Sequence, residues 1–141
     1  MEGPRLYIFT AAQIVALAAL FWVLATWSTP WNAQRYLGTA LAIIGVAGIA
    51  SARYELGKSF SIRPEAHKLV TTGIYSRIRN PIYVFGAVMV AGLILVWQRP
   101  LWWIALLVIV IAQTVRARRE ARVLEAAFGD AYREYRRKTW F

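Results

Sequence analysis

The sequence predicts an all-α integral membrane protein with about four transmembrane helices, a cytoplasmic polar segment and a C-terminal amphipathic helix. Hydrophobic residues make up 59% of the 141 residues, and the mean hydropathy is +0.44. Soluble domains are typically about 45–50% apolar. The hydrophobic residues also gather in four runs that polar and basic segments separate. The length suits a single domain, residues 1–141.

The first apolar run, residues 6–27, is uncharged and long enough to cross a bilayer core of roughly 30 Å at about 1.5 Å per residue. A signal peptide is the alternative for such a run. However, Glu2 and Arg5 form no strongly basic leader, and the run ends at Trp27 rather than at a small-residue cleavage site. We therefore expect a retained helix.

The other three runs are 15 or 16 residues long, slightly below the usual lower limit of roughly 17 for a spanning helix. They are residues 37–52, 82–97 and 101–115. Gly48 and Ala52 form a small-residue pair that favours close helix packing. Residues 98–100 make a tight connection, which predicts an antiparallel hairpin of the last two runs. By contrast, residues 53–80 are mixed in character, and we expect them to be partly irregular from Gly57 onward.

The basic residues are unevenly distributed along the chain, which has a net charge of +10. Of 17 lysines and arginines, six lie in residues 53–80 and eight in residues 116–141. Four crossings place both segments on one side of the membrane. The positive-inside rule makes that side cytoplasmic, together with both termini, in an inner or plasma membrane. Anionic lipid headgroups are then a better partner for this charge than nucleic acid.

The lack of cysteine and the single histidine exclude several kinds of site. The chain has no cysteine, which excludes disulfides, thiolate catalysis and Cys-based metal sites. It has one histidine, so a His-rich metal site is not expected either. We therefore predict no metal centre.

The charged tail predicts an amphipathic cytoplasmic helix. Gly129 interrupts its pattern as a C-terminal capping glycine would. Aromatic residues resume three apart at Tyr132 and Tyr135. Glu120, near the start of this tail, has arginine neighbours and is explained equally well by a surface salt-bridge network.

The stretch "HKLVTTGIYSRIRNPIYVFG", residues 67–86, concentrates polar groups beside the third apolar run. Pro81 suits the first turn of a helix, and Asn80 before it suits the N-cap. Arg79 is also explained as an interfacial cation that extends toward water, and Tyr75 and Tyr83 as interfacial aromatics. Each residue taken alone therefore has a structural explanation.

Taken together, these segments resemble the isoprenylcysteine carboxyl methyltransferase family and the related phospholipid methyltransferases. The first signature of the family is matched at His67, Leu69, Val70, Thr71, Gly73, Tyr75, Arg79, Asn80, Pro81, Tyr83 and Gly86. The second signature is matched at Glu120, Leu124, Phe128, Gly129, Tyr132 and Tyr135. Many members have a histidine where this chain has Asn80, and a second glutamate where it has Ala121.

The resemblance implies an S-adenosylmethionine-dependent methyltransferase with a lipid-like acceptor. It assigns catalysis to Arg79 and Glu120, and the cofactor pocket to residues 56–86 and 116–135. The cofactor-binding residues that it implies are His67, Leu69, Val70, Gly73, Tyr75, Asn80, Pro81, Tyr83 and Glu120.

More than one methyl acceptor, and more than one class of membrane protein, is compatible with these residues. An isoprenylcysteine-type carboxylate, on a prenylated substrate, is the favoured acceptor. It is already an anion and needs no strong base. A phospholipid amine would need one, and Glu120 or a tyrosine is the candidate. A membrane reductase that uses NADPH and a non-catalytic membrane subunit are the other readings. Small-residue helix faces also suit a homodimer.

Overall fold

The computed structural model describes residues 3–60 and 69–141, and every regular element among them is a helix. The elements are α1 (Gly3–Thr26), α2 (Ala33–Phe60), the short 3₁₀ helix η1 (Gly73–Ser76), α3 (Pro81–Trp97), α4 (Trp102–Phe128) and α5 (Asp130–Lys138). The predicted all-α class is therefore confirmed for the described residues.

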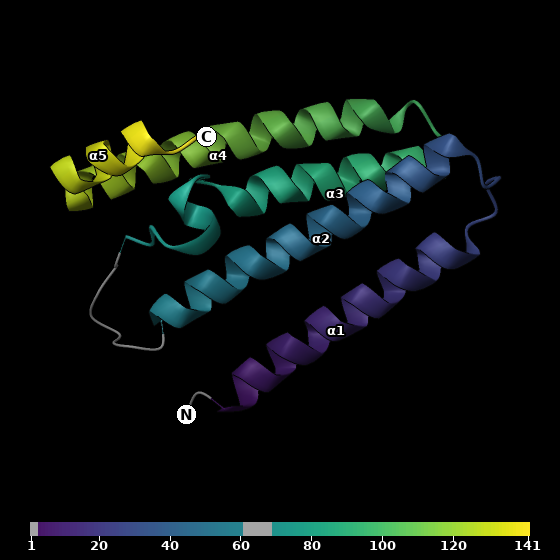
Figure 1. Cartoon of the computed structure of the whole chain (residues 1–141), viewed down its shortest axis with the longest axis horizontal. Helices are drawn as coiled ribbons and strands as arrows, with labels where there is room; N and C mark the ends of the chain where they lie inside the picture. Colours follow the sequence, from purple (N-terminus) through teal and green to yellow (C-terminus); the bar gives the residue numbers. More distant parts are fainter. Residues whose placement is uncertain (1–2, 61–68) are drawn as a thin grey trace.

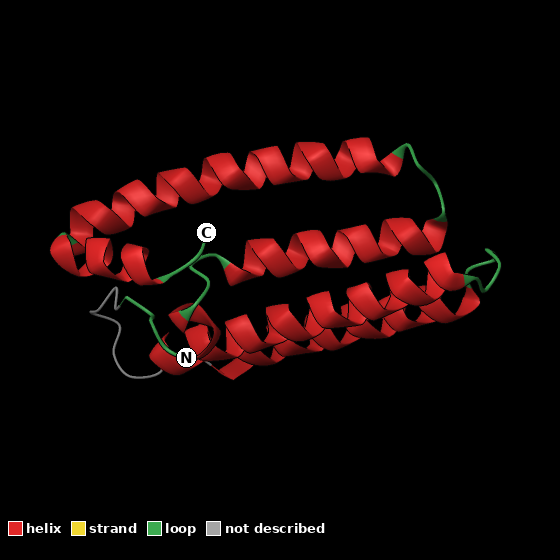
Figure 2. Cartoon of the chain, turned by 45° about the horizontal axis from the view of Figure 1, so that its top comes forward, coloured by secondary structure: helices red, strands yellow, loops and turns green. Residues whose placement is uncertain are grey.

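The four long helices run along the length of the molecule (Figure 1). Helices α2 and α3 pack side by side, and α4 lies on the far side of α3 from α2 (Figures 1 and 2). The α1–α2 and α3–α4 connections share one end of the bundle, while η1, α5 and the start of α3 gather at the other. Both segments with a family signature therefore lie at the same end.

One helix among the described residues is long and apolar enough to cross a membrane, judged by length and composition: Ala33–Gly57 within α2. Ile14–Thr26 and Pro81–Trp97 form shorter apolar helices. Helix α2 is also longer than the apolar run 37–52, because it continues to Phe60 and includes residues 57–60, which were predicted to be irregular. Gly57 inside a helix costs only about 1 kcal/mol relative to alanine, and the next proline is Pro64.

Glycines bring α2 and α3 into close contact. A Cβ at Gly92 would lie 2.4 Å from the backbone nitrogen of Ala42, and one at Gly48 would lie 2.1 Å from Cγ of Phe85. A larger side chain would require a shift of the α2 backbone at Gly92, and a shift of the Phe85 ring at Gly48. The close helix packing expected from Gly48 is thus present between these two helices.

A buried arginine joins α1 to the rest of the bundle. The Arg35 side chain is 1% exposed, and its guanidinium donates hydrogen bonds to the backbone carbonyls of Leu24, at 2.9 Å, and Thr29. It also lies over the ring of Trp31, 3.8 Å from the ring centroid. The Thr29 hydroxyl in turn donates to the carbonyl of Val96 at 2.7 Å. Arg35 of α2 therefore satisfies one carbonyl in the last turn of α1 and one in the connection that follows it.

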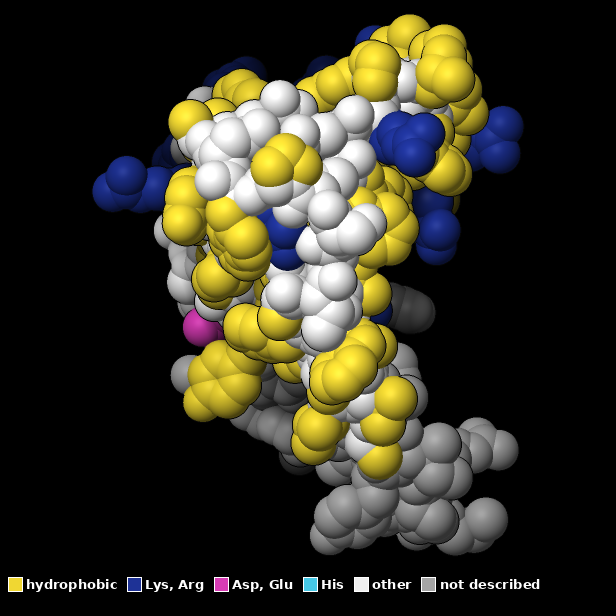
Figure 3. Space-filling model, turned by 90° about the vertical axis from the view of Figure 1, so that its right-hand side faces the viewer, with side chains coloured by type: hydrophobic (Ala, Val, Ile, Leu, Met, Phe, Trp, Pro, Cys, Tyr) yellow, Lys and Arg dark blue, Asp and Glu magenta, His cyan; other side chains and the backbone are white. Residues whose placement is uncertain are grey.

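Hydrophobic side chains cover much of the surface at the end of the molecule that contains the α1–α2 and α3–α4 connections (Figure 3). The rings of Trp27 and Trp97 lie 5.8 Å apart, and those of Trp97 and Trp102 lie 5.6 Å apart. Tryptophans are typical of the interface between a membrane and water.

Candidate functional site

The first signature segment is anchored on the end of α2 at Gly73. This glycine has a φ of +59°, and a Cβ there would lie 2.5 Å from Cδ of Glu55. Only glycine meets both conditions at low cost. The hydroxyl of Thr72 donates to Oε2 of Glu55 at 3.2 Å. Sequence reasoning did not select Glu55, although a carboxylate in a strongly basic segment was a usable signal.

Two buried tyrosines connect α5 to η1. The hydroxyl of Tyr135 donates to the backbone carbonyl of Tyr75 at 2.8 Å. Each side chain is 8% exposed. Burial raises the pKa of Tyr75 to about 12 and the pKa of Tyr135 to about 12. Both hydroxyls therefore stay protonated at neutral pH and act as neutral hydrogen-bonding groups.

The C-terminal residues pair with the backbone just before α3. The backbone N–H groups of Arg79 and Asn80 donate to the carbonyls of Trp140 and Phe141, at 3.0 and 2.9 Å. The N–H of Trp140 donates to the carbonyl of Arg77 at 2.7 Å. Sequence reasoning missed this pairing, because backbone hydrogen bonds outside regular strands leave almost no pattern in side-chain type.

Arg79, which sequence analysis predicts to be catalytic, points toward α5. Its guanidinium donates to the backbone carbonyl of Arg136 at 3.2 Å, in the last turn of that helix. A cation is favourable at a helix C-terminus, where carbonyls lack partners within the helix. The side chain is half-buried, so further N–H donors remain accessible from outside.

Asn80 and Pro81 begin α3, but only the proline acts as expected. Pro81 occupies the first helical turn. Asn80 stands at the N-cap, yet its side chain makes no capping hydrogen bond, so the predicted capping role is wrong. Instead, its carbonyl accepts from the N–H groups of Tyr83 and Val84, each at 3.1 Å, and its own N–H is used by the C-terminal pairing. The Asn80 amide is thus not used by the helix end.

Glu120 links α4 to α3 through Tyr83. The Tyr83 hydroxyl donates to Oε1 of Glu120 at 2.7 Å, across 37 residues of sequence. The Nε of Arg116 donates to the same oxygen at 3.2 Å. Its second oxygen, Oε2, accepts no hydrogen bond from the residues that the structure describes, and the side chain is 46% exposed. Glu120 therefore forms a salt bridge with Arg116 and also contacts Tyr83, a residue of the first signature.

The structure does not pair Arg79 with Glu120: the arginine contacts α5 and the carboxylate contacts α3. Burial raises the pKa of Tyr75, and the nearby negative charge of Glu120 raises it further. Leu69 and Val70 are half-buried in the segment before η1. His67 lies outside the described residues.

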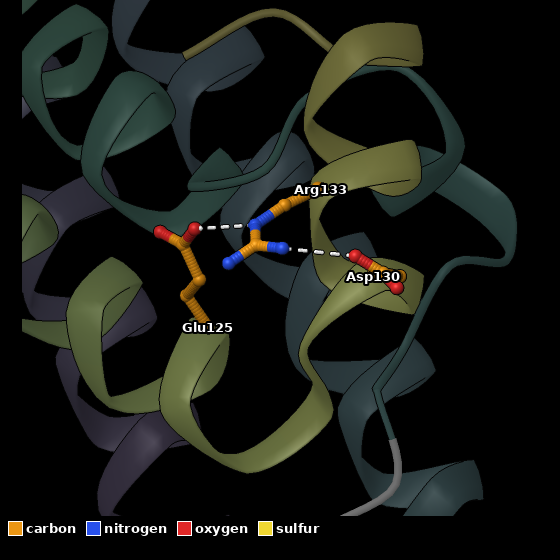
Figure 4. Close-up of polar contacts among 3 residues, drawn as sticks. All are labelled: Glu125, Asp130 and Arg133. Atoms are coloured by element: carbon orange, nitrogen blue, oxygen red, sulfur yellow. Dashed lines mark hydrogen bonds and ion pairs between the residues drawn. The ribbon is translucent and has the colours of Figure 1, made fainter.

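Ion pairs hold the corner between α4 and α5. Arg133 lies between Glu125 and Asp130, with N–O distances of 2.9 Å to each (Figure 4). Gly129 forms the corner with a φ of +55°, and its N–H donates to the carbonyl of Glu125 at 2.8 Å. The helix end predicted at Gly129 is confirmed. An open groove beside these ion pairs contains none of the predicted site residues.

The described ranges, residues 3–60 and 69–141, contain no group of three or more His, Cys, Asp or Glu side chains arranged to hold a metal ion. The polar groups at the site include the Glu120 carboxylate, the guanidinium groups of Arg79 and Arg116, the Asn80 amide and tyrosine hydroxyls. These groups suit a charged organic ligand that is held by hydrogen bonds and ion pairing.

One comparison with known proteins gives a match. A family model described as phospholipid methyltransferase matches residues 33–131, well over half of the chain. The matched stretch contains α2, η1, α3 and α4, and hence the contact between Tyr83 and Glu120. The comparisons with curated proteins and with solved structures returned no match.

Proposed function

Since the chain belongs to the phospholipid methyltransferase family, we propose that it transfers a methyl group from S-adenosylmethionine to a lipid-borne acceptor at a membrane surface. The family implies a membrane methyltransferase with lipid-like substrates. The observation that carries the proposal is the 2.7 Å hydrogen bond between Tyr83 and Glu120. It joins the two signature segments where the apolar helix α3 begins and the basic part of α4 starts.

S-adenosylmethionine supplies an electrophilic methyl group on a positively charged sulfur. Tyr83 and Arg116 fix one oxygen of Glu120, which leaves Oε2 to face a cation or accept a hydrogen bond. Arg79 uses one N–H on Arg136, so other N–H groups can hold a carboxylate. The residues thus contribute mainly by positioning and electrostatics, which suits an in-line displacement.

Two acceptors remain in the proposal, and they make different demands on Glu120. A carboxylate of the isoprenylcysteine type attacks the methyl carbon directly, and Arg79 would orient it. A phospholipid amine must also lose a proton, and Glu120 would be the base. In either case the acceptor atom bonds to the methyl carbon while the carbon–sulfur bond breaks, and the electron pair of that bond stays on sulfur.

We further propose four membrane crossings by α1 to α4 in an inner or plasma membrane, with the signature segments on the cytoplasmic side. The supporting observation is the shared location of η1, α5 and the basic part of α4 at one end of the bundle (Figure 1). A polar cofactor from the cytosol and a lipid from the bilayer can both reach that boundary.

Ligand binding in detergent tests the proposal directly. We expect titration calorimetry to detect binding of S-adenosylhomocysteine and no binding of NADPH. The reverse result, with the protein folded, would replace the methyltransferase by a reductase. Binding of neither ligand would favour a non-catalytic subunit.

Substitutions then test the assigned residues. Arg79→Ala and Glu120→Gln should each lower methyl transfer by about 100-fold or more, the usual effect of losing a key electrostatic group. Glu134→Gln is the matched control and should leave the rate unchanged, because that carboxylate is exposed and pairs with the exposed Lys138 within α5. Near-normal rates in both test variants would place the chemistry elsewhere.

A further inference from the structure

The last turn of α5 contains two arginine side chains that the chain itself does not use. Arg136 and Arg137 are exposed, and their guanidinium groups make no hydrogen bond or ion pair with any residue that the structure describes. The other two basic residues of this helix, Arg133 and Lys138, are each paired with carboxylates. Arg136 and Arg137 also line the open groove between α4 and α5. Two cations at one helix end therefore remain available for an anion.

An exposed tryptophan follows these arginines. The side chain of Trp140 is 65% exposed, although its ring lies 6.0 Å from that of Phe141. The backbone of Trp140 is held on both sides. Its N–H donates to the carbonyl of Arg77 at 2.7 Å, and its carbonyl accepts from the N–H of Arg79 at 3.0 Å. The pairing thus fixes a large aromatic ring beside the backbone that leads into α3.

This part of α5 lies where the apolar bundle begins. Helix α5 folds back along the end of α4, so that its last turn and residues 139–141 return to the start of α3 (Figure 1). The acidic residue of the first turn, Asp130, therefore lies farther from the apolar α3 than the basic last turn does. Arginine and tryptophan are the residue types that contact lipid headgroups and the membrane interface.

We propose that Arg136, Arg137 and Trp140 form a docking surface for anionic lipid headgroups of the cytoplasmic leaflet, separate from the site of the methyl acceptor. Guanidinium groups hold phosphate oxygens by charge-assisted hydrogen bonds, and the indole ring enters the interface beside them. The lipid is a regulatory partner and not a substrate, since phosphatidylglycerol has neither an amine nor a carboxylate to methylate. The inference rests on the membrane placement in the proposed function.

The docking surface is connected to the arginine that is predicted to be catalytic. Arg79 donates from its guanidinium to the carbonyl of Arg136 at 3.2 Å, and from its backbone N–H to the carbonyl of Trp140 at 3.0 Å. Two of the three docking residues thus hold Arg79 through their own backbones. A lipid that restrains the last turn of α5 also restrains Arg79, so we expect anionic lipid to raise the rate of methyl transfer.

The test places the whole chain in phosphatidylcholine nanodiscs with increasing fractions of phosphatidylglycerol. Hydrogen exchange is followed in peptides that span residues 130–138, and phosphatidylglycerol should slow it in the wild type. One basic residue near an anionic surface strengthens binding about fivefold. In Arg136→Gln and in Arg137→Gln, the phosphatidylglycerol fraction that gives half of the protection should therefore rise by about that factor.

Arg99→Gln is the matched control. It removes the same charge from an exposed position in the connection at the other end of the bundle. The response of α5 to phosphatidylglycerol should be unchanged in this variant. Methyl transfer is measured in the same nanodiscs, with phosphatidylethanolamine or N-acetyl-S-farnesylcysteine as the acceptor. Phosphatidylglycerol should raise the rate in the wild type and in Arg99→Gln, and should raise it less in Arg137→Gln.

The outcomes separate the docking surface from the proposed function. Equal exchange of α5 in both lipid compositions, or an unchanged phosphatidylglycerol response in Arg136→Gln and Arg137→Gln, would overturn the docking surface. Protection of α5 by inorganic phosphate in pure phosphatidylcholine would also overturn it, because the arginines would then hold a soluble anion. Protection that depends on these arginines, without methyl transfer to either acceptor, would uphold the docking surface and count against the proposed function.

Discussion

Tyr135 shows how one side chain can hold the signature segment in place. Its hydroxyl donates to the carbonyl of Tyr75, and both tyrosines are buried. Replacing Tyr135 by phenylalanine would leave that carbonyl without its partner, at a cost of roughly 1–3 kcal/mol. The burial of the two tyrosines also makes stability depend on pH in the alkaline range.

We predict that stability falls as the pH rises from about 10 to about 12. The pKa of Tyr75 and of Tyr135 is raised from 10.0 to about 12 by burial, so the folded state retains the protons longer than the unfolded chain does. The full stability is present below pH 10 and is lost as the pH approaches the folded-state pKa values. Thermal unfolding in detergent across this range measures the effect.

The matched variants are Tyr135→Phe and Tyr132→Phe. Tyr132 is also buried on α5, but its hydroxyl makes no hydrogen bond to the described residues. Tyr135→Phe should lower stability at neutral pH and flatten the alkaline decline, whereas Tyr132→Phe should do neither to the same extent. An unchanged alkaline decline in Tyr135→Phe would show that other groups cause it.

Individual residues also show where sequence reasoning succeeded. Pro81 and Gly129 lie at helix ends as predicted, because their conformational limits act locally. The side-chain cap predicted for Asn80 is absent, and the N–H groups of Tyr83 and Val84 donate to the backbone carbonyl of Asn80 instead. The roles assigned to Arg79 and Glu120 stay predictions that the substitutions above test.

At the scale of elements, the α2–α3 contact depends on missing side chains. We predict that Gly92→Ala destabilises the protein by about 1–3 kcal/mol or more, because its Cβ would overlap backbone atoms of Ala42. Gly86→Ala is the same chemical change in the same helix and has space for the methyl group. Thermal unfolding of the two variants side by side gives the measurement; equal stabilities would contradict the packing described here.

The pairing of the C-terminal residues with the start of α3 is a second element-scale feature. Trp140→Pro removes the N–H that donates to Arg77, whereas Trp140→Ala removes only an exposed side chain. We predict faster hydrogen exchange at the Arg79 and Asn80 amides in the proline variant alone. Mass spectrometry of peptides that span residues 77–80 measures this. Unchanged exchange in Trp140→Pro would mean that the pairing contributes no protection.

The boundaries of α2 show a limit of sequence reasoning at this scale. The mixed composition after residue 52 favoured an irregular segment from Gly57 onward, yet the helix continues to Phe60. Part of the reason is tertiary, because Glu55 in this extension contacts Thr72 and fits against Gly73. Contacts with the following segment stabilise helical turns whose composition alone is ambiguous.

At the scale of the whole molecule, the arrangement predicts membrane topology. The chain has no cysteine, so single cysteines can be introduced at Ser76, Arg99 and Glu134 without background. Ser76 and Glu134 lie on elements at one end of the bundle, and Arg99 lies in the connection at the other. We predict that an impermeant maleimide labels Arg99→Cys from outside intact spheroplasts, and the other two only from the cytoplasmic side. Labelling of all three from one side would contradict the proposed crossings.

The sequence by itself determined the all-α class, the order of the apolar helices and the polar character of one end, because hydrophobic runs, prolines and glycines act on their own neighbourhood. Only the tertiary structure decided which side chains meet. Tyr83 contacts Glu120 across 37 residues, and Tyr135 contacts the Tyr75 carbonyl across 60. Such contacts depend on how each helix is rotated and tilted against its neighbours, and a one-dimensional pattern of residue types does not specify those angles.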